Sequence, residues 1–485
     1  KTGVYFLTLI LFYERYSIFL KKMKRLFSIF LFFPLLVLSQ DYTSSFVSNQ
    51  TNFSCDSTDI NVSLKPILYS HFITDISSDR NNKNNLYAYG TLLNAKISSK
   101  LYITSKILNV GGNFNKSLLN YIDSLAVFPS MNQIDNKISY FSYSANYNIS
   151  KFFSTEFGNG THFIGNGYRS MLLSNNHTPY PYLSFTTNLW KVKYYNLFTT
   201  FSDIYSSDIS QKKHGAFHYL DYEPNKRLTI GIFEGIIWQA RDENYNRGYD
   251  LHYLNPIIFY RPVEFSKHSP DNALLGLNVN YELKNISFYS QVVLDDINLD
   301  RHDNSAGGFF QNKYAIQIGA KTNFNIDRHQ FNLLAEYNKA QPYTYAHKHP
   351  LQNYTHMNQA LAHPLGANFK EKVFLLNYTC SKWEAKIKYT HAVYGADSAS
   401  THYGQNIFIS DFLAQGEGGE YSYGNYNGQG IKTNLHTFYS ELSYNLKQVN
   451  FFLAYYFRKK STESLKSNYL IFGIKTDLIN PFLDF

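Results

Sequence analysis

The chain has 485 residues, of which 18% are aromatic (43 Tyr, 40 Phe and 3 Trp), and its mean hydropathy is −0.33. A helical membrane protein needs runs of about 20 apolar residues, and no such run follows residue 40. The net charge is +9 for the whole chain but +4 without residues 1–39, since 39 basic and 35 acidic residues remain. No basic run with interleaved aromatics is left, so a nucleic-acid partner is not expected.

The first 40 residues read as an export signal. Met23-Lys24-Arg25 precedes an apolar stretch from Leu26 to Leu38, and Val37 and Ser39 supply small-to-medium residues before Gln40. A basic, then apolar, then small-residue order is typical of a secretory signal peptide. We expect residues 1–22 to be upstream translated sequence, 23–39 to be the signal peptide and 40–485 to form one domain. The alternative is an N-terminal membrane anchor, which the intervening charges disfavour.

From about residue 60 onward, segments of about ten residues alternate apolar with polar side chains. One row is Leu275, Leu277, Val279, Tyr281 and Leu283, interleaved with Gly, Asn, Glu and Lys, and the alternation resumes at Ile286 after a short turn. Successive side chains of a strand point to opposite faces, so each segment has one apolar and one polar face. This pattern predicts an all-β fold, a transmembrane antiparallel β-barrel with lipid outside and polar groups inside.

Short polar turns divide these segments into pairs. We place them near Ser99–Lys100, Ile149–Lys151, Trp190–Lys191, Glu223–Lys226, Lys284–Asn285, Asp327–His329, Ser381–Lys382 and Lys447–Gln448. Longer connections cover 296–312, 340–370 and 394–434. Eight turns give 16 strands, and one strand at each end, the first around Ile60–Ile76, gives about 18. Short turns and both termini are expected in the periplasm, with the long loops extracellular, in the outer membrane.

Two segments carry further signals. Residues 111–129 have leucines and isoleucine at helical spacing after Ser117, which predicts either a short helix near the barrel mouth or an irregular loop. Near the C-terminus, Leu470, Phe472, Ile474, Thr476 and Leu478 form a lipid-facing row. A closing strand that ends in an aromatic residue resembles the signal read by outer-membrane assembly machinery, which we therefore expect as a partner. Closure onto the first strand would remove an exposed sheet edge.

The two cysteines, Cys55 and Cys380, do not make a disulfide framework. Cys380 shares a row with Phe374, Leu376 and Tyr378, so we expect it to be a small apolar residue facing lipid.

No nucleophile motif, phosphate loop or zinc spacing is present, so neither an enzyme nor a cofactor is expected. Four loop histidines (His347, His349, His356 and His363) suit either a metal site or ordinary hydrogen bonding, and the bonding role is preferred. Asp295 and Asp296, at a strand end, suit either calcium or simple solvation. The loops are rich in tyrosine, amides and arginine, chemistry that suits a polysaccharide as well as a hydrated loop.

The sequence of residues 163–190 resembles that of a known protein family. They contain a Gly-Asn-Gly-Tyr-Arg-Ser turn, a Leu-Leu-Ser-Asn-Asn run and a Pro-rich entry into a strand. Weaker matches are Leu254–Pro256 with Tyr260–Glu264, the strand end at Asp295 and Asp296, and Leu361–Phe369. Together these resemble the Wzi-like capsule-assembly family, and within it the gliding-motility group called RemB.

The resemblance implies a barrel of about 18 strands and a non-enzymatic role in holding exported polysaccharide, or in adhesion and gliding with other surface proteins as partners. Sugar-contact candidates in and around the motifs are Arg169, Asn175, Asn176, Tyr180, Arg261, Asp295, Asp296, Tyr343, His363 and Asn368. Their alternative role is to order a loop inside the lumen. The alternative function is an outer-membrane porin or solute transporter. Bulky residues on inward rows (Tyr289, Tyr439, Phe452 and Tyr456) favour a filled interior.

Overall fold

The computed structural model describes residues 60–76, 83–113, 137–206, 209–241, 247–250, 253, 271–296, 308–398, 402–415, 423–463 and 466–476. The expected signal peptide, Cys55 and Arg261 lie outside these residues. So does most of the proposed helical segment: Gly111 to Asn113 belong to a strand, and 114–136 are not described.

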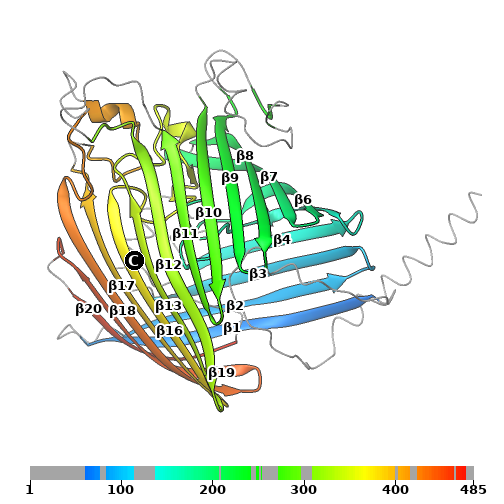
Figure 1. The fold of residues 1–485 in the computed structure, drawn as a ribbon. Coiled ribbons are helices and arrows are strands. Elements are labelled where there is room, and N and C mark those ends of the chain that lie inside the picture. The colour runs from blue at the N-terminus through cyan, green and yellow to red at the C-terminus, as the bar shows by residue number, and fades with distance from the viewer. Residues whose placement is uncertain are drawn as a thin grey trace, which may run out of the picture. The chain divides into compact units, whose positions relative to one another are not determined.

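Eighteen strands form one antiparallel sheet that closes on itself, which confirms the predicted barrel and its strand number (Figure 1). The last strand pairs with the first, from Tyr69 opposite Lys475 to Asp75 opposite Tyr469. The strands are β1 (Asn61–Asp75), β2 (Lys83–Lys96), β3 (Leu101–Asn113), β4 (Lys137–Asn148), β5 (Phe153–Gly160), β6 (Tyr180–Leu189), β7 (Val192–Ser206), β8 (Ile209–Asn225), β9 (Leu228–Gln239), β10 (Asn272–Leu283), β11 (Ile286–Asp296), β12 (Lys313–Ile326), β13 (His329–Ala340), β16 (Phe369–Cys380), β17 (Trp383–Ala396), β18 (Ile431–Leu446), β19 (Val449–Lys460) and β20 (Ser467–Lys475).

Short turns and long connections alternate along the barrel. All eight predicted turns are present, with two to four residues between strands, as at Lys284–Asn285 between β10 and β11. Several of these turns place a residue other than glycine at positive φ, among them Lys284 at 53° and Lys447 at 56°. The other end carries the long connections, including 161–179, 341–368 and 397–430. Two-residue turns at positive φ match the twist of paired strands, so these positions set the strand register.

The two faces of the strands separate as the alternation predicts. In β10, Leu277 is 43% exposed whereas the neighbouring Asn278 is 2% exposed, and in β20 Phe472 is 56% exposed. Phe374 is likewise exposed, and Cys380 on the same row is a free, half-buried thiol. One residue departs from the prediction: Thr476 lies beyond β20 and is buried, with its hydroxyl accepting a hydrogen bond from the backbone N–H of Leu68 at 3.2 Å.

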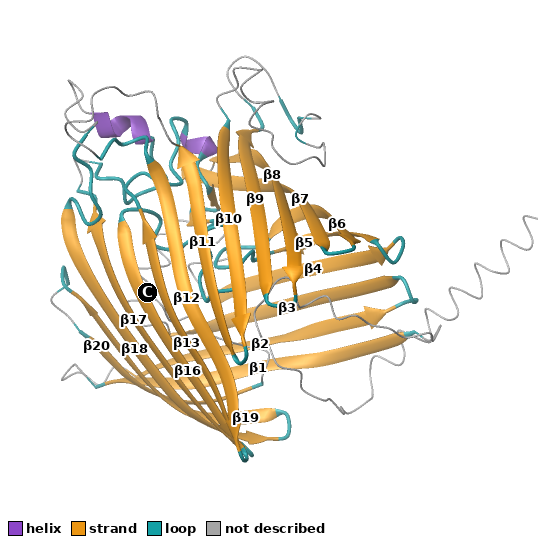
Figure 2. Ribbon diagram, in the orientation of Figure 1, coloured by secondary structure: helices purple, strands orange, loops and turns teal. Residues whose placement is uncertain are grey.

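The lumen is occupied by the chain itself. The long connections, drawn as loops in Figure 2, gather at one end together with the short 3-10 helices η1 (Pro350–Gln352) and η2 (Asp411–Gln415). The two-residue strands β14 (Thr355–His356) and β15 (Gln359–Ala360) lie within 341–368. No helix in the described part of the chain is long and apolar enough to cross a membrane. Tyr289, Phe452 and Tyr456 are buried and Tyr439 is packed against a buried cluster, as expected for inward rows.

Candidate functional site

The connection between β5 and β6, residues 161–179, crosses the lumen, and we call it the crossing loop. Its tip reaches mid-strand positions of the far wall: Asn166 accepts hydrogen bonds from the Asn278 side chain at 2.9 Å and, through its carbonyl, from Lys321 Nζ at 3.0 Å. A Cβ at Gly165 (φ +142°) would lie 2.1 Å from Gln291 Nε2, and one at Gly167 would lie 2.3 Å from Glu336 Oε2. The Gly-Asn-Gly turn is therefore needed for close approach to the barrel wall.

Glu336, on β13, is the principal acceptor for this tip. Its carboxylate accepts from the N–H groups of Tyr168 at 2.7 Å and Arg169 at 3.1 Å, and from the Tyr289 hydroxyl at 2.8 Å. The amide of Asn338 donates a fourth bond at 2.8 Å. A buried carboxylate with this many donors is stabilised where it lies. The crossing loop is thus bonded to the wall by side chains that strands present inward.

Arg169 is the buried cation of the crossing loop. Its guanidinium donates to both carboxylate oxygens of Glu371 on β16, at 3.1 and 3.3 Å, and the ring of His363 contacts the same carboxylate at 2.7 Å. The Arg169 carbonyl accepts from Gln317 at 2.8 Å. Arg169, Glu371 and His363 are each at most 3% exposed. This arrangement orders the loop rather than presenting a charge to a ligand.

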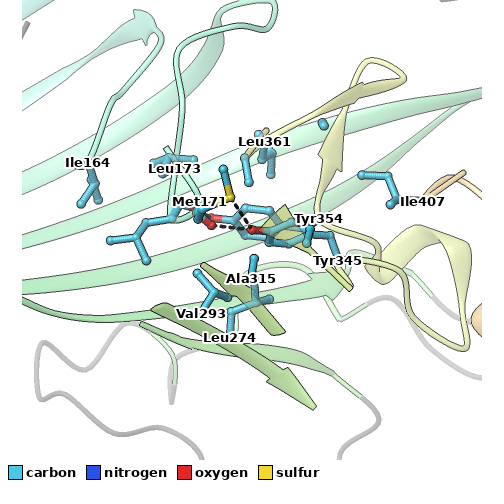
Figure 3. Close-up of a cluster of buried hydrophobic side chains, with 14 of the residues drawn as sticks. Ile164, Met171, Leu173, Leu274, Val293, Ala315, Tyr345, Tyr354, Leu361 and Ile407 are labelled. Atoms are coloured by element: carbon cyan, nitrogen blue, oxygen red, sulfur yellow. Dashed lines mark hydrogen bonds between the residues drawn. The ribbon is translucent and has the colours of Figure 1, made fainter. Parts of the chain in front are cut away.

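The connection between β13 and β16, residues 341–368, lies over the crossing loop, and we call it the covering loop. The hydroxyls of Tyr345 and Tyr354 donate to the carbonyls of Met171 and Leu172, at 2.8 and 2.7 Å. Around these contacts lies a buried apolar cluster that joins both loops to strands β10 to β12 (Figure 3). Aromatic rings that also satisfy buried carbonyls fix two loops against one another. The lumen therefore contains two packed layers.

Two buried, ion-paired lysines on the strands donate hydrogen bonds to the covering loop. Lys213 on β8 donates to Asp203, to the Thr355 hydroxyl at 2.7 Å and to the Asn353 carbonyl at 2.9 Å. On the opposite wall, Lys313 pairs with Asp411 at 2.6 Å and donates to the Ala346 carbonyl. All of these are buried ionic groups with several partners each. Such groups are costly to bury unless paired, so they hold one specific loop arrangement.

Besides His363 and Asn368, three of the predicted residues contact the covering loop or belong to it. Asp295 is buried and accepts from the Tyr345 N–H at 2.7 Å, and the Tyr343 hydroxyl donates to the His402 carbonyl at 2.9 Å. Tyr180 is buried beside His162, His177 and His356. Burial lowers the pKa of His177 to about 4 and that of His356 to about 3. In this arrangement Asp295, Tyr343 and Tyr180 offer no free surface to a sugar.

The remaining predicted residues fall at different places. Asn175 is exposed, and Asn176 is half-buried with no hydrogen-bond partner for either side-chain polar atom among the described residues. Asp296 is half-buried at the end of β11. Within the described parts of the chain, no group of three His, Cys, Asp or Glu side chains is placed to hold a metal ion.

Asn368 connects several segments at the long-loop end of the barrel. At φ +55°, its side-chain amide donates to the carbonyls of Gly395, Tyr403 and Gln429 at 3.0 to 3.1 Å, and its Oδ1 accepts from the Gly428 N–H at 2.7 Å. Asn427 extends the attachment by donating to the carbonyls of Ala340 and Phe369. One buried asparagine therefore joins both ends of the 397–430 connection to the rim of the barrel.

These contacts shape an open cavity of about 450 Å³ at the rim. It is lined by Ser398, Tyr403, Tyr423, Gly424, Asn425, Tyr426, Gln429, Gly430 and Ile431. Tyr426 is 65% exposed, and Gln429 holds Asn425 through a 2.8 Å bond. Flat aromatic faces beside amides and a hydroxyl are groups that can stack on a sugar ring and bond its hydroxyls. We call this cavity the rim pocket.

Asp397 fixes the wall of the rim pocket. It accepts from the N–H groups of Tyr403 at 2.5 Å and Asn406 at 2.9 Å, and it contacts the ring of His402 at 3.3 Å. Burial raises the pKa of this carboxyl, but the hydrogen bonds outweigh burial and the net pKa is lowered. None of the rim-pocket residues is among the candidates proposed from sequence. The available signal was the run Tyr-Gly-Asn-Tyr-Asn-Gly-Gln-Gly at 423–430, rich in tyrosine and amides.

An 18-stranded barrel with an apolar outer face and a lumen filled by its own loops defines the class, an outer-membrane-type β-barrel with a plugged interior. The sequence model of one family, described as Capsule assembly protein Wzi, matches residues 60–385. The chain therefore belongs to the Wzi capsule-assembly family. No curated protein matches it significantly in sequence.

Several solved structures are similar to this chain. Wzi of Escherichia coli, described as an outer membrane protein involved in group 1 capsule assembly and as a carbohydrate-binding β-barrel, superposes with a TM-score of 0.55 at 11% identity over 86% of this chain and 84% of that one. OccAB4 of Acinetobacter baumannii gives 0.47 at 10% identity over 87% and 98%. OpdK, an outer membrane protein of Pseudomonas aeruginosa, gives 0.46 at 9% identity over 86% and 98%.

Proposed function

We propose that this protein binds surface polysaccharide at its long-loop end and holds it on the cell, without catalysis. The observation that carries the proposal is the rim pocket, where Tyr403, Tyr423 and Tyr426 adjoin Asn425 and Gln429. Membership of the capsule-assembly family supports a polysaccharide as the ligand. The filled lumen supports a static binding role, since the crossing and covering loops share one buried apolar cluster with the barrel wall.

The proposal includes a location and an orientation. The barrel would lie in the outer membrane, with the rim pocket outside and both termini in the periplasm, because long loops are extracellular in bacterial barrels of this type. The apolar, outward row of β20 (Leu470, Phe472 and Ile474) supports recognition by the outer-membrane assembly machinery.

Among the residues proposed from sequence, we retain Asn175 and Asp296 as secondary sugar contacts, since the first is exposed and the second half-buried. Both side-chain polar atoms of Asn176 are buried, which favours a role inside the loop. Arg261 remains a proposal on its motif alone. For Arg169, Tyr180, Asp295, Tyr343, His363 and Asn368, burial favours a role in ordering loops.

The same surface would serve adhesion and gliding motility if the held polymer contacts a substratum or another surface protein. This finer role is supported by the motif resemblance at 163–182. Deletion of the gene tests both roles at once, with polysaccharide retention and cell spreading measured on the same strain. Normal retention with lost spreading would favour motility over capsule attachment.

The direct test is binding of the detergent-purified barrel to a glycan array and to polysaccharide purified from the same cells. Tyr426→Ala removes an exposed ring, and truncation of such an anchor at a binding site typically costs a factor of about ten in affinity. Tyr426→Phe keeps the ring and is the matched control. Absence of binding by the unmodified protein would overturn the proposal, and equal binding by the alanine variant would remove the rim pocket from it.

A further inference from the structure

The eight short turns form a ring of positive charge at the end of the barrel opposite the rim pocket. Every turn carries Lys or Arg, and the nine cations, all exposed, are Lys100, Lys151, Lys191, Lys226, Arg227, Lys284, Arg328, Lys382 and Lys447. Between the paired strands Asp327 is the one acid in these turns, and Glu223 and Glu282 are exposed at adjoining strand ends. None of the nine forms an ion pair with another described residue. We call this set the turn ring.

The opposite end has the opposite sign. The connections there, 76–82, 114–136, 161–179, 207–208, 240–271, 297–312, 341–368, 397–430 and 461–466, contain ten basic and sixteen acidic residues in sequence. The small net charge of the barrel therefore conceals a separation of charge along its axis. Fields from unpaired surface charges of one sign select partners of the other sign.

An aromatic girdle adjoins the turn ring. Trp190 is 82% exposed, Trp383 49% and Phe152 46%, and all three lie in short turns or next to them. The ammonium groups of Lys151 and Lys191 lie 4.7 and 5.3 Å above the rings of Phe152 and Trp190. Aromatic rings of membrane proteins concentrate at the border between hydrocarbon and headgroups. Lysines stacked on these rings are therefore at headgroup depth.

We propose that the turn ring binds anionic phospholipid headgroups in the leaflet that surrounds the short-turn end. The partner is a lipid rather than a soluble polyanion because two of the cations, Lys151 and Lys191, lie over aromatic rings that border the apolar outer face. Each Lys or Arg near a negatively charged lipid surface contributes favourably to attraction. The ring would collect a shell of anionic lipid and fix the depth and tilt of the barrel independently of any ligand at the rim.

The chain carries its own reporters for this shell. Of its three tryptophans, Trp190 and Trp383 lie at the turn ring, whereas Trp238 is fully buried near the long-loop end of β9. Bilayers of phosphatidylcholine that contain either brominated phosphatidylglycerol or brominated phosphatidylcholine, with bromines near the carbonyl end of the chain, report lipid contact by quenching. We expect quenching of the reconstituted protein to favour the brominated anionic lipid about fivefold in mole fraction.

The test variant is K151Q/K191Q/R227Q/K382Q, which neutralises cations around the two reporters. Its matched control, K348Q/K370Q/K432Q/K459Q, removes four exposed lysines from the long-loop end. The preference for the anionic lipid should fall to near one in the test variant and persist in the control variant. The charge-conserving variant K151R/K191R/K382R should retain it. For the unmodified protein, about 1 M salt shortens the screening length to ~3 Å and should abolish the preference without any substitution.

Equal quenching of the unmodified protein by both lipids at low salt would overturn the proposal. So would a preference that survives both neutralisation and high salt. A soluble acidic polysaccharide and inorganic phosphate are added to the same bilayers as competitors. The proposal requires that neither reduces the quenching, and displacement of the lipid by the polysaccharide would assign the turn ring to a glycan instead.

Discussion

At the scale of single residues, the interior depends on a few ionic groups that each hold several partners. Glu371 is the clearest case, since it receives Arg169 from the crossing loop, His363 from the covering loop and Asn338 from β13. Its removal leaves a guanidinium in a site with almost no water. A buried charge that loses its counter-charge is destabilising because neither solvent nor another group compensates it.

We therefore expect Glu371→Gln to lower the free energy of unfolding by about 3–5 kcal/mol. The measurement is the loss of the compact electrophoretic form with heat or urea. Glu384→Gln is the matched control, because Glu384 pairs with Lys386 at 3.1 Å in a partly exposed site, where ion pairs contribute about 0–1 kcal/mol. Similar destabilisation by both variants would contradict the role assigned to Glu371.

Asn368 allows a separate residue-scale prediction about the rim pocket. Asn368→Gly tolerates the backbone angle of +55° but removes the four side-chain bonds to Gly395, Tyr403, Gln429 and Gly428. We expect polysaccharide affinity to fall about tenfold, while the strand content is unchanged. Circular dichroism and glycan binding measure the two effects. Asn285→Gly, in an exposed turn at the other end, should alter neither the strand content nor the binding. Unchanged glycan binding by N368G would show that Asn368 does not shape the rim pocket.

At the scale of elements, the strands and turns were predictable from sequence because their determinants are local. Alternation at period two identified the lipid-facing row of β10, and a polar pair such as Lys284–Asn285 is enough to mark a turn. The loops follow a different rule. Tyr168 bonds Glu336 across 168 positions in sequence and Arg169 bonds Glu371 across 202, so no local pattern reveals those contacts.

The same limit explains why several predicted sugar-contact residues are buried inside the barrel. Loop composition makes Arg169 and Tyr343 sugar-contact candidates, and the motif resemblance adds Asn368. The structure gives each of them an internal partner. Composition cannot distinguish a tyrosine that faces solvent from one that faces a carbonyl of another loop. The tyrosines of the rim pocket are the same residue type as the buried loop tyrosines, but they lie on the outer side of the loops.

The contact between the crossing and covering loops should depend on pH. His177 and His356 lie with ring centroids 6.3 Å apart, beside Tyr180, and Asp203 and Lys213 are the charged groups near His356. Burial lowers their pKa values from 6.5 to about 4 and about 3. Such histidines take up protons on unfolding, so the native loops are fully stable above about pH 6.5 and lose stability as the pH falls toward 4.

Each histidine should cost the loops about 1.4 kcal/mol per pH unit below 6.5. Limited proteolysis between pH 7.5 and 4.5 follows the loosening of 161–179 and 341–368. His177→Gln with His356→Gln should reduce this dependence, and the remainder belongs to His162 and His347, whose pKa values burial lowers to about 3. His349→Gln, at an exposed position, should leave it unchanged. Cleavage that is independent of pH in the unmodified protein would contradict the prediction.

At the scale of the whole molecule, the barrel and its contents have separate stabilities. Eighteen strands are closed by backbone hydrogen bonds and need no interior, while the loops are attached to the wall by side chains such as Lys213, Lys313 and Glu336. A barrel of this strand number has room for an aqueous channel when it is empty. The two packed loops therefore decide whether the protein is a binding platform or a pore.

This division gives a final prediction. In planar bilayers the unmodified protein should carry no steady conductance, and replacement of 343–366 by a short Gly-Ser linker should produce a stable open channel, because the crossing loop loses the tyrosines that cover it. Replacing 424–427 by a Gly-Ser linker of the same length is the control, since it alters the rim pocket but not the bonds from the covering loop to the carbonyls of Met171 and Leu172. A large steady conductance in the unmodified protein would favour the transporter alternative, because solute would then pass between the loops and the wall. Closed behaviour in both altered proteins would mean that the crossing loop alone, bonded to Glu336 and Glu371, seals the lumen.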